Sequence, residues 1–307
     1  MILIMLLMNC KVSSMWYIDE YLLFLSNKRL LSDNTIRSYK ADLNCFSTYC
    51  FKYKKLDDPC KVNRAIINSY LKFLYGKNLS SLTVTRRLVA IRSFFEFLKR
   101  NNSIILNGLD SVKGPKSIKK LPEILSERQI DSLFNEILVK CNASSRDILV
   151  IELFYSTGIR VSEITKIELK HINFNKNTIK IIGKGSTERI VIFGERLLFK
   201  LEKYADKLCS SQKFLFQSNL KKTVKPLSSK TIYNIVKKYF KLMTKNEKLS
   251  PHSIRHSFAT HMLNNGADIL TVKELLGHKS LSSTQIYTQV QTSKIKKTYF
   301  QSHPHGK

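Results

Sequence analysis

Apolar residues recur at helical spacing over most of the first hundred residues of this chain. Between residues 34 and 51 they fall on one face, and a similar stripe runs through residues 61–75. Residues three and four apart lie on the same side of a helix, so these stripes predict amphipathic helices that pack on one another. Four helices are expected within residues 16–100: about 16–27, 34–51 (capped by Asp33), 61–75, and a fourth that is capped by Ser80 or Ser81. Short loops between them predict a small bundle.

The helical pattern stops between Asn101 and Pro122, where turn-forming and charged residues replace the apolar face. Such a composition predicts an exposed linker. We therefore expect a helical domain over residues 15–107, a basic linker over residues 108–122 and a second domain over residues 123–307. Residues 1–8 form an apolar run that is too short to span a bilayer, and we interpret residues 1–14 as a candidate non-native extension ahead of Met15. A weak membrane or export tag is the alternative for that segment.

The second domain is predicted to combine helices with one short β-hairpin. Ile and Val dominate residues 177–182 and 188–193, which flank the glycine-containing turn that carries Lys184. This pattern predicts two antiparallel strands with Lys184 at the tip. Helices are expected from Ser126 onward, over residues 147–155, 195–208 and 229–243, and as three short helices within residues 250–290. The predicted fold class is mainly α with a small antiparallel β-hairpin or sheet.

The three short helices of residues 250–290 have clear end signals. Ser250 and Pro251 suit the first N-terminus, Asp268 is expected to cap the second helix and Gly277 to end it. The buried stripe of the first helix should consist of Ile254, Phe258 and Met262.

Four polar side chains are spaced across this helical unit, and together they suit a phosphate. They are His252, Arg255, His278 and Tyr287. An arginine presents a planar fork of donors, a histidine can donate or transfer a proton, and a tyrosine hydroxyl can act as a nucleophile. We therefore expect chemistry on a phosphate group here.

The charge of the chain points to a polyanionic partner. Its 307 residues include 52 Lys and Arg against 23 Asp and Glu, a net charge of +29. DNA, RNA or an acidic membrane surface would fit that charge. The alternative is that an A/T-rich genome encodes many lysines, which would then lie on solvent-exposed faces without binding a partner. Basic residues such as Arg86 and Arg87 lie off the apolar stripes and would as a set form a phosphate-contacting face.

The cysteines and the hydropathy predict a soluble cytoplasmic protein. The six cysteines include no C-x-x-C pair, which favours reduced thiols in the cytosol. No long apolar run follows the first residues, so no association with a membrane is expected.

The same stretch resembles the C-terminal signature of the tyrosine recombinases, the phage integrase family. The resemblance rests on residues 252–256 (HSIRH), on Leu276-Gly277-His278 and on Tyr287, and the fuller string is similar to the Xer branch. Residues 154–164 (FYSTGIRVSEI) resemble the first arginine motif, which would make Glu163 a group that orients basic side chains. Residues 183–189 (GKGSTER) resemble the hairpin segment, with Thr187 where a basic residue is common. Residues 30–46 resemble the start of the family's helical core-binding domain.

The resemblance implies a set of catalytic residues and a metal-independent reaction without cofactors. The set is Arg160, Lys184, His252, Arg255, His278 and Tyr287. Tyr287 would attack phosphorus and form a 3′-phosphotyrosine, while His252 takes its proton and Lys184 protonates the leaving 5′ oxygen. The cationic side chains would stabilise the charge that a metal ion stabilises in other enzymes.

Other assignments for these residues are weaker. The turn at Lys184 lacks the P-loop pattern, and a zinc protease would need Glu where Ser253 stands. His256 and His261 are expected to be structural. Tyr299 is the nearest rival nucleophile, but it lies outside the matching string.

The resemblance also implies partners and a biological role. Double-stranded DNA would be bound by a homo- or heterotetramer of recombinases, with a septal translocase of the FtsK type as a candidate activator. The tail at residues 303–306 (HPHG) is similar to the end of Xer proteins, which packs into the neighbouring protomer, whereas the sequence alone would favour a frayed tail. The implied role is resolution of chromosome or plasmid dimers. The alternatives are a phage or mobile-element integrase, a type IB topoisomerase-like activity and a non-catalytic DNA-binding regulator.

Overall fold

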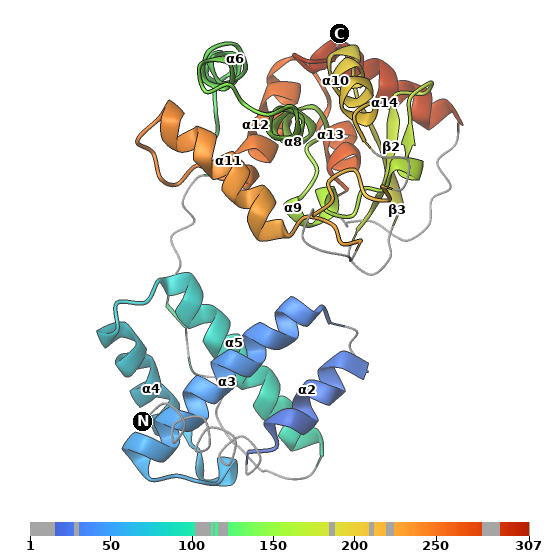
Figure 1. The fold of residues 1–307 in the computed structure, drawn as a ribbon. Helices are drawn as coiled ribbons and strands as arrows, with labels where there is room; N and C mark the ends of the chain where they lie inside the picture. Colours follow the sequence, from blue (N-terminus) through green and yellow to red (C-terminus); the bar gives the residue numbers. More distant parts are fainter. Residues whose placement is uncertain are drawn as a thin grey trace. The chain divides into compact units, whose positions relative to one another are not determined.

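The computed structural model describes residues 16–27, 31–101, 112, 114–115, 122–183, 188–208, 212–218, 224–277 and 289–306. Figure 1 shows its fold. The chain divides into two compact units, residues 1–120 and 121–307, and separate hydrophobic clusters form their cores. The candidate extension, residues 1–14, and most of the predicted linker lie outside the described residues.

The first unit is a bundle of the four predicted helices. They are α2 (Ile18–Asn27), α3 (Asp33–Lys54), α4 (Arg64–Gly76) and α5 (Ser81–Arg100), with a short 3₁₀ turn η1 (Pro59–Lys61) before α4. The α3 cap differs from the expectation, because Ser32 occupies the N-cap position and Asp33 is the first helical residue. A carboxylate in the first turn still favours the helix, since it faces the positive end of the macrodipole. Ser80 caps α5 by accepting a hydrogen bond from the Thr83 N–H.

Part of the basic face predicted for this bundle makes internal contacts instead. Asp42 on α3 is buried, and Arg86 and Arg87 on α5 both pair with it. A buried carboxylate needs such partners, because an unpaired charge in the core would be strongly destabilising. These two arginines therefore connect α5 to α3. The prediction had placed them on a phosphate-contacting face and had not included this contact.

The second unit is mainly helical with a three-stranded antiparallel sheet, so the predicted fold class is confirmed. The sheet contains β1 (Ile172–Asn173), β2 (Thr178–Ile182) and β3 (Glu188–Ile192) in that order. The predicted hairpin is β2–β3, in which Ile179 pairs with Val191, and β1 is an added edge strand. The helical elements are α6 (Glu127–Ser132), the π-helix η2 (Leu133–Ile137), α7 (Leu138–Lys140), α8 (Ser145–Thr157), α9 (Val161–Ile164), η3 (Leu169–His171), α10 (Glu195–Ala205), α11 (Ser229–Met243), α12 (Pro251–Asn264), α13 (Ile269–Leu276) and α14 (Gln289–Ser302).

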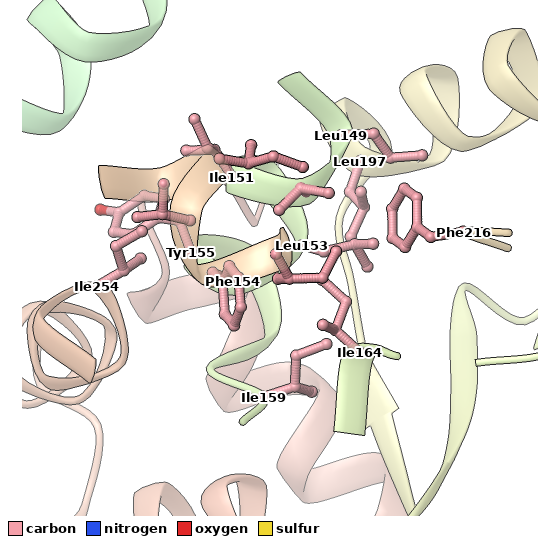
Figure 2. Close-up of a cluster of buried hydrophobic side chains, with 14 of the residues drawn as sticks. Leu149, Ile151, Leu153, Phe154, Tyr155, Ile159, Ile164, Leu197, Phe216 and Ile254 are labelled. Carbon is pink, nitrogen blue, oxygen red and sulfur yellow. The ribbon is translucent and has the colours of Figure 1, made fainter. Parts of the chain in front are cut away.

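Helix α8 forms the centre of this unit. Its side chains from Leu149 to Thr157 are all buried, so the helix is enclosed by other elements. Figure 2 shows Leu153 and Phe154 of α8 among side chains from other elements, including Leu197 of α10 and Ile254 of α12. Because α8 is packed against other elements on several sides, the position of its C-terminal end, and so of the residues that follow it, is well defined.

A left-handed glycine ends α8 and sets the direction of the next segment. Gly158 has φ +58°, and a Cβ there would lie 2.8 Å from side-chain atoms of both Leu276 and Phe258. Only glycine combines that backbone conformation with such close neighbours. The turn predicted at this position therefore brings α12 and α13 against the start of α9.

The C-terminal tail packs on the core of its own chain and is not frayed, in contrast to what the sequence alone would favour. The Tyr299 hydroxyl of α14 donates to the Ser156 carbonyl at 2.9 Å, and His305 Nδ1 lies 2.6 Å from Glu152 Oε1. Glu152 is fully buried on α8 and also pairs with Arg196 and Lys200 of α10. Burial alone would raise the pKa of Glu152, but the interaction with His305 and then that with Lys200 lower it to about 2. The tail is thus fixed by an ionised carboxylate in the core.

Candidate active site

Arg160 is held at the N-terminus of α9 by Glu163. The Arg160 backbone N–H donates to Glu163 Oε2 at 2.8 Å, and its guanidinium Nη1 donates to Oε1 at 2.9 Å. The Arg160 side chain is 37% exposed, whereas that of Glu163 is 3% exposed. Glu163 therefore orients an arginine that still reaches solvent.

A second arginine shares the Glu163 carboxylate. Arg189 of β3 donates from Nη1 to Oε1 at 2.7 Å and from Nη2 to Oε2 at 2.8 Å. Burial would raise the pKa of Glu163, but the hydrogen bonds and charges of Arg189 and Arg160 lower it to about 2. The carboxylate is ionised at neutral pH and joins β3 to α9.

Arg255 of α12 is a buried cation that binds two backbone carbonyl groups. Its Nη1 donates to the Gly158 carbonyl, and its Nη2 donates to the Leu276 carbonyl at 2.7 Å. Burial, and then the positive charge of Arg160, lower the pKa of Arg255 to about 10. The guanidinium remains charged at neutral pH. It joins the turn after α8 to the end of α13.

The histidines of α12 divide between its surface and the core. His252 and His256 are exposed, so the structural role expected for His256 is not supported. Partial burial and the charges of His252 and Arg255 lower the pKa of His256. His261 is structural as expected: its Nε2–H donates to the Leu125 carbonyl at 2.8 Å, and its Nδ1 accepts from the Tyr155 hydroxyl at 2.9 Å.

The described part of the chain contains three of the six predicted site residues. Arg255 binds the Gly158 carbonyl group, two residues before Arg160, and His252 is one turn from Arg255 on α12. Lys184, His278 and Tyr287 lie outside the described residues. The segments that precede Lys184 and His278 end as predicted, because β2 ends at Ile182 and α13 is closed by left-handed Gly277 at φ +64°.

Tyr299 cannot serve as the nucleophile in this conformation. Its ring is fully buried and stacks on His303 with 5.1 Å between ring centroids, while its hydroxyl donates to a backbone carbonyl group. Burial also raises the pKa of its hydroxyl. A phosphate could not reach this oxygen, so Tyr287 stays the predicted nucleophile.

Sequence reasoning missed Arg189, although one signal was present. Arg189 and Val191 are two apart in a strand, so they share a face, and the buried Val191 shows that this face turns inward. An arginine on an inward face needs an anionic partner. Glu163, which was already predicted to orient basic side chains, was a candidate for that anionic partner.

Comparison with known proteins identifies the family. The model of the phage integrase family matches residues 123–294, and that of its N-terminal SAM-like domain matches residues 18–102. This chain belongs to the phage integrase family. It is a tyrosine recombinase, as the motif at residues 252–287 implied.

Several curated tyrosine recombinases are similar over nearly their whole length. The chain is 36% identical to tyrosine recombinase XerD of Staphylococcus saprophyticus over 298 residues, which cover 94% of this chain and 98% of the relative. It is 34% identical to tyrosine recombinase XerC of Pediococcus pentosaceus, covering 90% of this chain and 94% of the relative. The predicted Xer resemblance is therefore confirmed.

Solved structures confirm the fold. The XerH site-specific recombinase bound to a palindromic difH substrate matches with a TM-score of 0.67 at 22% identity, covering 85% of this recombinase and 78% of that chain. The Tn1549 transposon integrase in complex with transposon right end DNA matches with a TM-score of 0.68 at 16% identity, covering 91% and 98% of the two chains. Among the described helices of this recombinase, none is long and apolar enough to cross a bilayer.

Proposed function

We propose that this recombinase cuts and rejoins double-stranded DNA at a specific site through a 3′-phosphotyrosine intermediate. The observation that carries the proposal is the charge cluster around Glu163. Two guanidinium groups, those of Arg160 and Arg189, bind this carboxylate, and Arg255 binds the Gly158 carbonyl group two residues before Arg160. The cluster therefore has an excess of positive charge, which suits a phosphate that gains negative charge as the nucleophile attacks.

The proposed reaction is an in-line displacement at phosphorus. The Tyr287 oxygen forms a bond to phosphorus as the bond to the 5′ oxygen breaks, and Arg160, Arg255 and His278 donate hydrogen bonds to the non-bridging oxygens. His252 takes the tyrosine proton, and Lys184 gives a proton to the leaving 5′ oxygen. The ester energy remains in the phosphotyrosine, so a 5′ hydroxyl from another strand can reverse the step without ATP.

The proposed assembly is a tetramer with two protomers at each site, built from this chain alone or together with a related recombinase. The palindromic substrate of the structurally similar XerH supports this, because a palindrome presents the same half-site to two protomers. The curated relatives are named XerD and XerC. On the basis of this similarity, we propose that the recombinase resolves chromosome or plasmid dimers in the cytoplasm. A translocase of the FtsK type is the proposed activator.

A nicked suicide substrate tests the chemistry. The DNA carries the candidate recombination site of the host, and a covalent adduct is detected on a denaturing gel for the wild type, Tyr287→Phe and Tyr299→Phe. We expect an adduct from the wild type and Tyr299→Phe, and none from Tyr287→Phe. An adduct that persists in Tyr287→Phe would contradict the nucleophile assignment, and bound DNA without an adduct in the wild type would favour a regulator.

A further inference from the structure

We infer that Arg189 is a positioning residue for DNA cleavage, acting through Glu163 on Arg160 and through Gly277 on the end of α13. The inference rests on the proposed function, because it concerns the rate of the same reaction. Arg189 belongs to β3, the strand that follows the hairpin turn. It therefore connects the sheet to two other parts of the candidate site.

The first connection determines how much of Arg160 remains available. Arg189 places one donor on each oxygen of Glu163, at 2.7 and 2.8 Å. Paired donors on a carboxylate fix both its orientation and its charge. Because Arg189 balances this charge, Arg160 can share the carboxylate at its Nη1 and keep a side chain that is 37% exposed.

Loss of Arg189 would change Glu163 in a way that reaches Arg160. The carboxylate is 3% exposed, and burial by itself raises its pKa. Without Arg189 the group would either take up a proton or draw Arg160 inward as its remaining cation. Either change alters the hydrogen bonds that Arg160 can offer to a phosphate.

The second connection is a close steric contact with Gly277. A Cβ on Gly277 would lie 2.7 Å from Arg189 Cδ and 3.0 Å from its Nε, and Gly277 has φ +64°. The preceding carbonyl group, that of Leu276, accepts a hydrogen bond from Arg255 at 2.7 Å. Arg189 and Arg255 thus contact adjacent residues at the end of α13, immediately before His278.

The Nε of Arg189 takes no part in the two hydrogen bonds to Glu163. Its Nε is buried and has no hydrogen-bond partner among the described residues. An unsatisfied buried donor is unfavourable, and such groups in native proteins call for an explanation. The close approach to Gly277 supplies one, because the Nε is packed against that glycine.

The test compares Arg189→Lys with Glu188→Ala. The lysine keeps the positive charge beside Glu163 but loses the fork of donors, so folding is less endangered than by alanine. Glu188 is the neighbouring residue of β3 and forms an exposed ion pair with Lys180, so its variant controls for a change in the same strand. Cleavage of the suicide substrate is measured in single turnover at saturating protein, together with DNA affinity and the melting temperature.

We expect Arg189→Lys to slow cleavage about 10- to 100-fold, as loss of a preorganised electrostatic group does. DNA affinity should change little, because phosphate contacts elsewhere dominate it. Glu188→Ala should cleave at the wild-type rate. The wild type is run on the same gel. If it forms no adduct, the proposed function fails; if it forms one and the variants do not differ from it, only the inference about Arg189 fails.

A double-mutant cycle separates positioning from general stability. In an Arg160→Lys background, Arg189→Lys should slow cleavage much less than in the wild type, because both changes act on the same interaction. Equal effects in both backgrounds would overturn the inference. So would wild-type cleavage by Arg189→Lys, or a loss of cleavage that only follows the fraction of folded protein.

Discussion

At the scale of single residues, the ionised Glu163 makes stability depend on acid pH. Its pKa is about 2 in the folded chain, below the ordinary value of 4.5, so the folded state binds fewer protons than the unfolded state between these values. The stabilisation is therefore complete above about pH 5 and is lost as the pH falls toward 2.

Glu163→Gln should show this dependence directly. At pH 7 we expect a loss of about 3 kcal/mol in the free energy of unfolding, because Arg189 would be left without its anion. The difference from the wild type should shrink at pH 3, where the wild-type carboxylate begins to lose its advantage. Denaturant midpoints at both pH values measure it, with exposed Glu188→Gln as the control. A difference that does not change with pH would contradict the assignment.

The residues of the candidate site differ in how far sequence could predict them. Arg160, His252 and Arg255 were predicted because they belong to local motifs, and helix α12 and the Gly158 turn follow from local end signals. Arg189 was missed because its partner Glu163 is 26 residues away. Only the packing of β3 against α9 shows that they meet.

At the scale of elements, the tail is the part that local signals described least well. Residues 303–306 have a polar composition typical of a frayed end, yet His303 and His305 are buried. Their partners are supplied by α8, about 150 residues earlier in the chain. By contrast, helices with a regular apolar stripe, such as α3 and α5, were predicted to within a few residues.

Gly194→Ala should displace this tail. A Cβ on Gly194 would overlap the carbonyl oxygens of His305 and Gly306, and backbone atoms cannot move aside as a flexible side chain can. We expect a destabilisation of about 1–3 kcal/mol. Amide hydrogen exchange over residues 299–306 should also become faster.

Gly76→Ala is a matched control for that prediction. Gly76 ends α4, and a Cβ there would have no atom within 4 Å. In Gly76→Ala, amide hydrogen exchange over residues 299–306 should be as slow as in the wild type. Unchanged exchange in Gly194→Ala would show that the tail does not depend on this contact.

At the scale of the whole molecule, the chain divides into two consecutive units, residues 1–120 and 121–307. Each unit has its own buried core, and the net charge of +29 favours binding to a polyanion. If both units contact one DNA, their connection raises the affinity, because binding of the first raises the local concentration of the second.

A protease site inserted within residues 116–121, at the boundary between the two units, tests this. Cleavage of the inserted site should lower DNA affinity by about 100-fold, the order expected when two linked binding modules are separated. The same protein before cleavage is the control, and affinity is measured at one fixed salt concentration because phosphate contacts are salt-dependent. Equal affinity before and after cleavage would mean that one unit accounts for binding.

The contact between Arg189 and Gly277 also limits how this sequence can diverge. A larger residue at position 277 would require a smaller one at position 189, and that change would leave the buried Glu163 without its main partner. Substitution at any one of positions 163, 189 and 277 is therefore unfavourable unless the other two also change. Among homologues they should vary together or remain constant, although they lie on three separate segments of the chain.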